Sequence, residues 1–183
     1  LVLVNDERGA ARVALGLAGL GYGTSWSVVM RHARDPDREP TVPVESMPFV
    51  RARPLIRESY LRDPEIPDRL ADPFTEQHGL KERAIGATFF VGVVDGEPAG
   101  SCELYVDGVD AQVENVATLE EFRGRGVASS VVLAAVEAAR TAGAAHVFIV
   151  ADEDDWPKDL YARLGFDRVG RIAGFLRAPA AAG

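Results

Sequence analysis

The stretch Thr118-Leu-Glu-Glu-Phe-Arg-Gly-Arg-Gly-Val-Ala-Ser129 joins a β-like run of residues to an Ala/Val-rich run typical of a helix. It places small residues and two arginines where that helix begins. A helix N-terminus presents unpaired backbone N–H groups and a partial positive charge, and small residues let a phosphate reach those groups. The stretch therefore predicts a phosphate cradle; the simpler alternative is a glycine-rich turn with surface arginines.

Two common phosphate loops do not fit this stretch. The dinucleotide fingerprint G-x-G-x-x-G needs a third glycine, but positions 124, 126 and 129 hold Gly, Gly and Ser. The P-loop needs Gly-Lys-Ser/Thr, and no lysine stands near these glycines in the sequence. A cradle at this junction would therefore be of another kind.

The surrounding pattern predicts a mixed sheet of the α/β class. Upstream lie three β-like runs, separated by Asp95-Gly96 and Asp107-Gly108, and such Asp-Gly steps favour type I′ hairpin turns. Downstream, a helix, an apolar strand, a helix and a closing strand alternate, which indicates one right-handed parallel βαβ step after an antiparallel meander. The predicted elements are strands 88–94, 100–106 and 112–119, helix 127–141, strand 145–150, helix 156–164 and strand 168–177.

The remaining residues divide into three regions. Residues 54–85 are predicted to form two helical pieces, broken by prolines near position 65, with Leu70, Phe74 and Leu80 facing the core from the second piece. Residues 35–48 are rich in proline and charge, and we interpret them as a linker that buries no core face. Residues 1–34 are predicted to form a strand, a helix and a strand, and their apolar start suggests that the natural chain begins upstream of Leu1.

Composition and charge narrow the class of protein. The chain has 183 residues, 47% of them apolar, and a formal net charge of −8. Negative charge repels phosphate backbones, so nucleic acid is a poor expectation as the main partner. No apolar run is long enough to cross a membrane. A single cysteine and no signal peptide favour a reducing compartment, the cytoplasm.

Two motifs together resemble one family. Arg123-Gly-Arg-Gly-Val-Ala128 fits the R/Q-x-x-G-x-G/A signature of the GCN5-related N-acetyltransferase (GNAT) superfamily, and Leu160-Tyr-Ala-Arg-Leu-Gly-Phe166 resembles its late F/Y-Y-x-x-x-G-F segment. The resemblance runs from about residue 50 to 177 of this chain. It implies a GNAT-like fold, with an acetyltransferase domain over residues 49–179.

The resemblance also implies a cofactor and its binding residues. The sheet would splay between the strand ending near Leu119 and the strand at 145–150, and the pantetheine arm of acetyl-CoA would lie in that split. The arm would pair with backbone groups of Val116, Ala117 and Thr118. The pyrophosphate would lie beside the signature arginine, Arg123. It would be held mostly by backbone N–H groups of Gly124, Arg125, Gly126, Val127, Ala128 and Ser129.

The implied reaction is direct transfer of acetyl from the thioester to a primary amine of a small molecule or peptide, in a ternary complex. Tyr161 matches the family's usual acid, which protonates the departing thiolate. For the base that deprotonates the amine, strand alternation puts Glu114 on one face with Gln112 and Val116. Glu103, on the neighbouring strand, is the second candidate, and we favour Glu114.

Four further features bear on cofactor contacts, metal binding and the roles of single residues. Many relatives have an asparagine seven residues before the tyrosine, but this chain has Asp154, which would repel phosphates and puts that cofactor contact in doubt. The three histidines are scattered, so no metal is expected. Cys102 lies mid-strand without a neighbouring histidine and is predicted to pack in the core. Trp156 either covers the cofactor or plugs the start of the last helix, and we favour the second.

Residues 1–34 also repeat the plan of residues 146–179, with Gly21-Tyr22 corresponding to Gly165-Phe166. Either they are the tail of a degenerate, partial GNAT-like lobe, or they are an unrelated extension. Leu17 falls where the second copy has Tyr161, so the first copy would lack the acid. For the whole chain, two alternatives to an enzyme remain: an acyl-CoA-binding regulatory module without turnover, and a structural or dimerisation domain, for which a homodimer would be in keeping.

Overall fold

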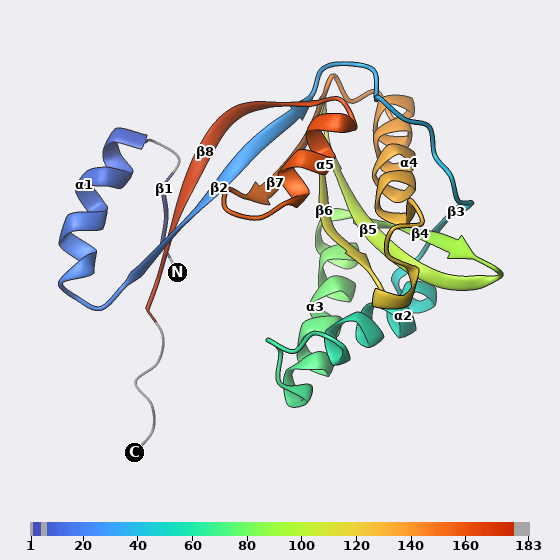
Figure 1. Ribbon diagram of the computed structural model, residues 1–183, viewed down its shortest axis with the longest axis horizontal. Helices are drawn as coiled ribbons and strands as arrows, with labels where there is room; N and C mark the ends of the chain where they lie inside the picture. The colour runs from blue at the N-terminus through green and yellow to red at the C-terminus, as the bar shows by residue number, and fades with distance from the viewer. Residues whose placement is uncertain (1, 5–6, 178–183) are drawn as a thin grey trace. The chain divides into compact units, whose positions relative to one another are not determined.

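Figure 1 shows the computed structural model, which describes residues 2–4 and 7–177. The chain divides into two compact units: unit 1 comprises residues 1–34 and 149–183, and unit 2 comprises residues 35–148. The described residues form eight strands, five α-helices and one short 3-10 helix: β1 (Val2–Val4), α1 (Glu7–Ala18), β2 (Gly23–His32), β3 (Val44–Met47), α2 (Phe49–Leu61), α3 (Asp68–Ile85), β4 (Thr88–Val94), β5 (Glu97–Asp107), β6 (Asp110–Thr118), η1 (Glu120–Phe122), α4 (Val127–Thr141), β7 (His146–Asp152), α5 (Pro157–Arg163) and β8 (Phe166–Leu176).

Unit 2 is built on the predicted antiparallel meander, with strand order β6-β5-β4-β3. The first hairpin turns at Asp95 and Gly96, both left-handed (φ 54° and 86°), which confirms the type I′ prediction. The second hairpin is present, but its turn lies one residue later than predicted. Asp107 pairs with Asp110, and of the two turn residues between them only Gly108 is left-handed (φ 58°).

The predicted parallel step follows the meander. The backbone N–H groups of Ala145 and His146 donate to the carbonyl oxygen of Val109, at 2.8 and 3.0 Å. Since Val109 directly precedes β6 and His146 begins β7, the two strands start at the same edge and run parallel. The connecting helix α4 packs closely on the sheet, because a Cβ at Gly92 would lie 3.0 Å from the Val127 side chain. The mixed α/β fold is therefore confirmed.

Helices α2 and α3 form as the two predicted pieces, but the buried face of α3 differs from the prediction. Leu80 is 55% exposed, and Leu70 and Phe74 are only partly buried. The buried residues are Ala71, Thr75, His78 and Gly79. The reason is close packing on α2: a Cβ at Gly79 would lie 2.7 Å from the Phe49 ring, so α3 approaches α2 most closely at a position where no side chain fits.

The segment 35–48 is more than a linker, and the prediction that it buries no core face is wrong. Its last part forms β3, which pairs antiparallel with β4. Val42 and Met47 pack against the buried core of unit 2. β3 is the last strand in the order of unit 2, and an edge strand tolerates flanking prolines such as Pro43 and Pro48, which misled the sequence-based prediction. Figure 1 shows the segment running alongside α4 on its way to β3.

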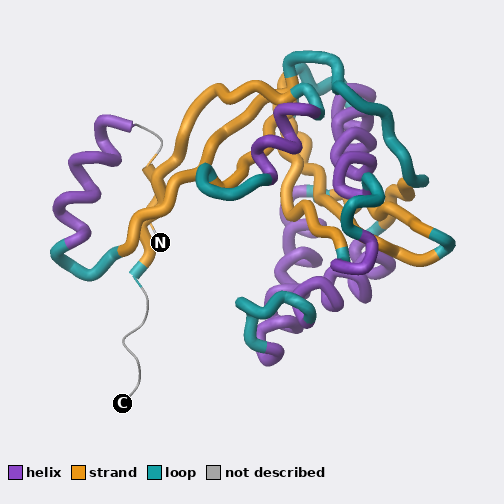
Figure 2. Tube along the Cα trace, viewed as in Figure 1, coloured by secondary structure: helices purple, strands orange, loops and turns teal. Residues whose placement is uncertain are grey.

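Unit 1 contains the predicted strand-helix-strand of residues 1–34, of which Leu1, Asn5 and Asp6 lie outside the described residues. β8 pairs antiparallel with both β1 and β2, and α1 packs beside these strands (Figure 2). Gly21 and Gly165, the corresponding glycines of the two repeats, are both left-handed (φ 77° and 90°). The repeated plan is therefore present in the backbone, and its origin in a degenerate lobe stays a prediction.

Candidate active site

The junction between β6 and α4 has the backbone features that a phosphate cradle needs. Gly126 is the N-cap of α4 and is left-handed (φ 82°), and no described side chain caps the helix. Gly124 is left-handed as well (φ 75°), and a Cβ built on it would meet no described atom within 4 Å. The first N–H groups of α4 are thus left to a ligand or to water, and open space lies beside Gly124.

The space beside Gly126 is already filled by protein. A Cβ at this position would clash with the hydroxyl of Thr41, which donates to the carbonyl of Arg125 at 3.2 Å. The backbone N–H groups of Thr41 and Val42 donate to the Ser130 hydroxyl, at 2.9 and 3.2 Å. Gly126 is therefore needed for the close approach of the Thr41 segment, whereas Gly124 faces the open side of the junction.

The two arginines of the signature have different surroundings. Arg125 forms an ion pair with Asp95 of the β4–β5 turn, at 2.9 Å, and both side chains are exposed. Arg123 is exposed and has no ion-pair partner among the described residues. Its charge is available to an anion, while that of Arg125 is shared with Asp95.

An orphaned hydroxyl supports a ligand along the end of β6. The Oγ1 atom of Thr118 is buried and has no hydrogen-bond partner among the described residues. A buried hydroxyl without a partner is costly, and such groups usually await a ligand or water. The resemblance puts the arm of acetyl-CoA along Val116, Ala117 and Thr118, so the residues present fit this group.

A β-bulge lies at the start of this segment and includes Val116. Glu103 of β5 pairs with Glu114 and Ser101 pairs with Ala117, so Asn115 and Val116 together stand opposite Cys102. Asn115 is left-handed (φ 51°) in the middle of a strand. The bulge interrupts the strict alternation used to predict one face for Gln112, Glu114 and Val116, and such a bulge bends its strand.

A cluster of polar side chains converges on Glu103, which is only 1% exposed. One carboxylate oxygen, Oε1, accepts from Nδ1 of His78. The other, Oε2, accepts from the Tyr105 hydroxyl, from Nδ2 of Asn115 at 2.9 Å and from Nζ of Lys81 at 3.4 Å. Every donor lies in unit 2, and together they satisfy the buried charge.

The protonation of the cluster follows from burial. Burial first, and then the Lys81 ammonium, lower the pKa of His78 to about 4. Neutral His78 donates from Nδ1 to Glu103 and accepts at Nε2 from the Tyr60 hydroxyl, 2.7 Å away. Burial and the Glu114 carboxylate raise the pKa of Tyr105, so its phenol stays protonated.

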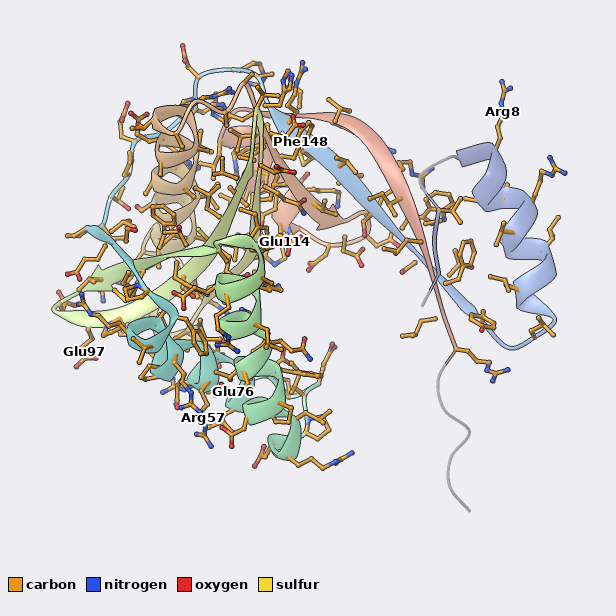
Figure 3. All side chains as sticks on the ribbon, turned by 180° about the vertical axis from the view of Figure 1, so that it is seen from behind. Arg8, Arg57, Glu76, Glu97, Glu114 and Phe148 are labelled. Carbon is orange, nitrogen blue, oxygen red and sulfur yellow. The ribbon has the colours of Figure 1, made fainter. Side chains whose placement is uncertain are left out.

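The two candidate bases have contrasting surroundings. Glu114, labelled in Figure 3, has a side chain 36% exposed. It accepts from Nε2 of Gln112 at 2.5 Å and lies 3.6 Å from Nζ of Lys81 on α3. Glu103 is buried and its oxygens are occupied. Solvent, and hence an amine, can reach Glu114 more easily than Glu103.

Five members of this cluster were missed by the sequence analysis: Tyr60, His78, Lys81, Tyr105 and Asn115. The misplaced face of α3 hid His78, although the small residues Ala71, Thr75 and Gly79 recur at helical spacing on its side and could have revealed it. A left-handed Asn115 inside a strand leaves no mark in the sequence.

The predicted acid, Tyr161, lies in unit 1 on α5. It is buried (6% exposed), and its ring centroid is 6.3 Å from that of Phe166. Before α5, the backbone N–H of Asp154 donates to the Asp152 carboxylate at 2.8 Å, closing a tight acidic turn. Trp156 is 62% exposed, so the prediction that it plugs the helix start is wrong.

Two other expectations concern metals and the cysteine. In residues 2–4 and 7–177 no three His, Cys, Asp or Glu side chains gather as a metal site would require. Cys102 is fully buried, its thiol donates to the carbonyl of Val131 at 3.3 Å, and burial raises its pKa. The packing role predicted for Cys102 is thus confirmed. None of the described helices combines the length and apolarity that a membrane span requires.

Comparison with known proteins agrees with this geometry. The family model described as "Acetyltransferase (GNAT) family" matches residues 53–166, more than half of the chain. The protein therefore belongs to the GNAT acetyltransferase family. None of the curated proteins compared with the chain matches it.

Several solved structures share the fold. A functionally unknown conserved protein from Staphylococcus epidermidis is 18% identical with a TM-score of 0.69, over 94% of this chain and 67% of its own. A GNAT acetyltransferase from Colwellia psychrerythraea is 16% identical with a TM-score of 0.68, over 94% of this chain and 63% of its own. A tandem GNAT protein from the clavulanic acid biosynthesis pathway is 18% identical with a TM-score of 0.65, over 96% of this chain and 60% of its own. The chain thus spans 60–67% of the length of each of these proteins, and the likeness shows the fold.

Proposed function

We propose that this protein is an N-acetyltransferase that transfers acetyl from acetyl-CoA to a primary amine by direct attack in a ternary complex. The observation that carries the proposal is the β6–α4 junction. No described side chain caps its helix, and open space lies beside Gly124. The Thr118 hydroxyl, at the end of the adjoining strand, has no hydrogen-bond partner among the described residues.

The cofactor would be held mainly by backbone groups. The N–H groups of residues 124–129 bind the pyrophosphate, with Arg123 adding charge at the surface. Backbone groups of Val116, Ala117 and Thr118 bind the pantetheine arm as an added strand would, and Thr118 Oγ1 gains a partner. When bound, acetyl-CoA supplies an activated acetyl group and a thiolate leaving group.

Two side chains would move the protons. Glu114 accepts a proton from the substrate ammonium, directly or through a water, and the free amine then forms the new N–C bond as the C–S bond breaks. Tyr161 would donate its phenolic proton to the departing sulfur. The second proton, which the nitrogen loses as it becomes an amide, would restore the phenol, and Glu114 would return its proton to solvent. The more exposed position of Glu114 supports its choice as the base over Glu103.

The acceptor is a small-molecule or peptide amine. The net charge of −8 favours a cationic acceptor, since opposite charge draws it to the protein. The same charge speaks against nucleic acid as a partner. We expect the protein to act in the cytoplasm without a membrane partner.

A thiol-release assay with a panel of primary amines tests the proposal, together with calorimetric titration of CoA. Amine-dependent release of CoA thiol is the expected result. Binding of CoA with no release across the panel would favour an acyl-CoA-binding regulatory module, an alternative that Asp154 in the place of an asparagine supports. Absence of CoA binding would contradict both functions.

A further inference from the structure

A left-handed residue inside a strand needs an explanation. Among the described residues, only Asp95 and Asn115 are non-glycine residues with positive φ. Asp95 sits in a hairpin turn whose geometry requires that conformation. Asn115 lies within β6, where regular pairing with β5 would not allow it. Asparagine enters this conformation at lower cost than most residues, but something must still select it there.

The side chain of Asn115 shows what selects it. Its Nδ2 donates to Oε2 of Glu103, 2.9 Å away, on the facing strand. Asn115 is exposed, whereas Glu103 is almost completely buried. The amide thus ties an exposed bulge residue to a fixed point inside unit 2.

Glu103 is fixed because donors from two further directions hold it. His78 of α3 binds Oε1, and Tyr105 of β5 and Lys81 of α3 bind Oε2. Strained backbone conformations persist where surrounding contacts over-determine them, and they gather at binding and catalytic sites. Glu103 is held by several contacts at once, and we call it the anchor of the bulge.

We propose that Glu103 is a positioning residue that acts through Asn115: it holds the β6 bulge and thereby directs the backbone of Val116, Ala117 and Thr118 toward the arm of CoA. The inference rests on the proposed function. Side chains and backbone groups alternate along a strand with a period of two. If the bulge relaxed to regular pairing, these N–H and carbonyl groups would therefore face the side away from CoA. The anchor would therefore govern cofactor affinity although it lies outside the contact surface.

Substitutions at Asn115 separate the backbone conformation from the hydrogen bond. Asn115→Gly permits the left-handed conformation but removes the amide, and Asn115→Asp also tolerates it but sets a carboxylate against Glu103. We expect the Kd for CoA, measured by calorimetry, to rise about 10-fold for Asn115→Gly and further for Asn115→Asp, since the bulge is then unheld or repelled.

A double-mutant cycle tests the route from Glu103. Glu103→Gln alone should weaken CoA binding, and in the Asn115→Gly background it should add less than a twofold change, because its effect passes through the missing amide. If Glu103→Gln fails to fold, Asn115→Gly and Asn115→Asp still decide the matter.

Three results would overturn the inference. Wild-type CoA affinity in both Asn115 variants would refute the anchor and leave the proposed function standing. Fully additive effects in the cycle would show that Glu103 acts by another route. Absence of CoA binding to the wild-type protein would instead refute the proposed function, and the positioning role with it.

Discussion

Two of the junctions at which a strand passes into a helix, β6–α4 and β7–α5, have opposite chemistry. Between β6 and α4 the turn holds Arg123, Gly124, Arg125 and Gly126, and no described side chain caps the helix. Between β7 and α5 the turn is Asp152-Glu-Asp-Asp155, and the helix begins at Pro157. The same local topology thus presents a basic, open helix end in one case and an acidic one in the other.

The topology places a helix N-terminus at both junctions, but the residues of each turn determine whether an anion can bind there. An acidic turn repels phosphate, so only the first junction is suited to an anionic carrier. The second junction leads into the helix that carries Tyr161. Binding and proton transfer should therefore be separable by mutation: changes at the first junction should act on the Kd for CoA, and changes beyond the second should act on kcat.

The largest effect is expected from placing the second junction's chemistry in the first. Gly124→Asp adds a carboxylate on the open side of the cradle, and we expect CoA binding to weaken at least about 100-fold through charge repulsion in a partly shielded site. Gly124→Asn is the matched control, since both residues tolerate the left-handed conformation and differ mainly in charge. If the calorimetric Kd values of the Asp and Asn variants agree within threefold, charge at the first junction does not control CoA binding.

Tyr161→Phe tests the other side of the comparison. Loss of the phenolic proton should lower kcat roughly 100-fold or more, the usual range for a general acid, with the Kd for CoA unchanged within about twofold. Tyr22→Phe, in the same unit and away from α5, provides the control. Steady-state kinetics with an unaltered kcat would remove Tyr161 as the acid.

Acid should weaken unit 2, which holds the first junction, through His78. The imidazole titrates near pH 6.5 when unfolded and at about 4 in the folded protein. The unfolded chain therefore binds more protons between these values, so the contribution to stability is present above pH 6.5 and is lost as the pH falls toward 4. It amounts to roughly 3 kcal/mol at most.

Urea unfolding at pH 7 and pH 4 measures this loss in the wild type and in His78→Asn. The asparagine amide can replace the donor to Glu103 but does not titrate, so the variant should lose about 3 kcal/mol less than the wild type over the same interval. Equal losses in the two proteins would show that His78 does not titrate as described.

A smaller effect is expected at Arg123. Its side chain is exposed, so removal of the charge in Arg123→Gln should raise the Kd for CoA only about threefold to tenfold, and high salt should reduce the difference. Arg12→Gln, which removes the same charge from α1, should leave the Kd unaltered. An equal effect of both variants would mean that only the net charge matters.

The smallest effect is expected at Asp154 in the second junction. If this junction does not touch the phosphates, Asp154→Asn should change the Kd for CoA by less than about twofold, as surface substitutions usually do. A tenfold gain in affinity would show that the second junction also contacts the carrier, and the division between the two junctions would fail.

Local signals allowed much of the fold to be predicted. The Asp95-Gly96 turn is specified by its two residues, because both need positive φ. Helix α4 forms over the predicted residues, from the glycines before it to Gly143 after it. The signature before α4 is equally local, so the candidate cradle could be placed at this junction from the sequence, whereas the left-handed conformation of Gly124 and Gly126 was not predicted.

The parts that could not be predicted depend on contacts between distant residues. Thr41 fills the space at Gly126 from more than 80 positions upstream, and a proline-rich pattern gave no sign of it. A large side chain at position 126 would thus displace the Thr41 segment before it met a phosphate. Likewise, the cluster around Glu103 depends on the packing of α3 against α2 at Gly79, which reverses the face that the bulky residues Leu70 and Leu80 suggested.

We have proposed that the first turn of α4 holds CoA with its sulfur directed at Tyr161. A crystal structure of the protein with CoA tests it most directly. We predict the pyrophosphate within hydrogen-bonding distance of backbone N–H groups of residues 124–129, and the sulfur within reach of the Tyr161 hydroxyl. CoA bound elsewhere, or a first turn of α4 covered by protein side chains in the complex, would contradict the account.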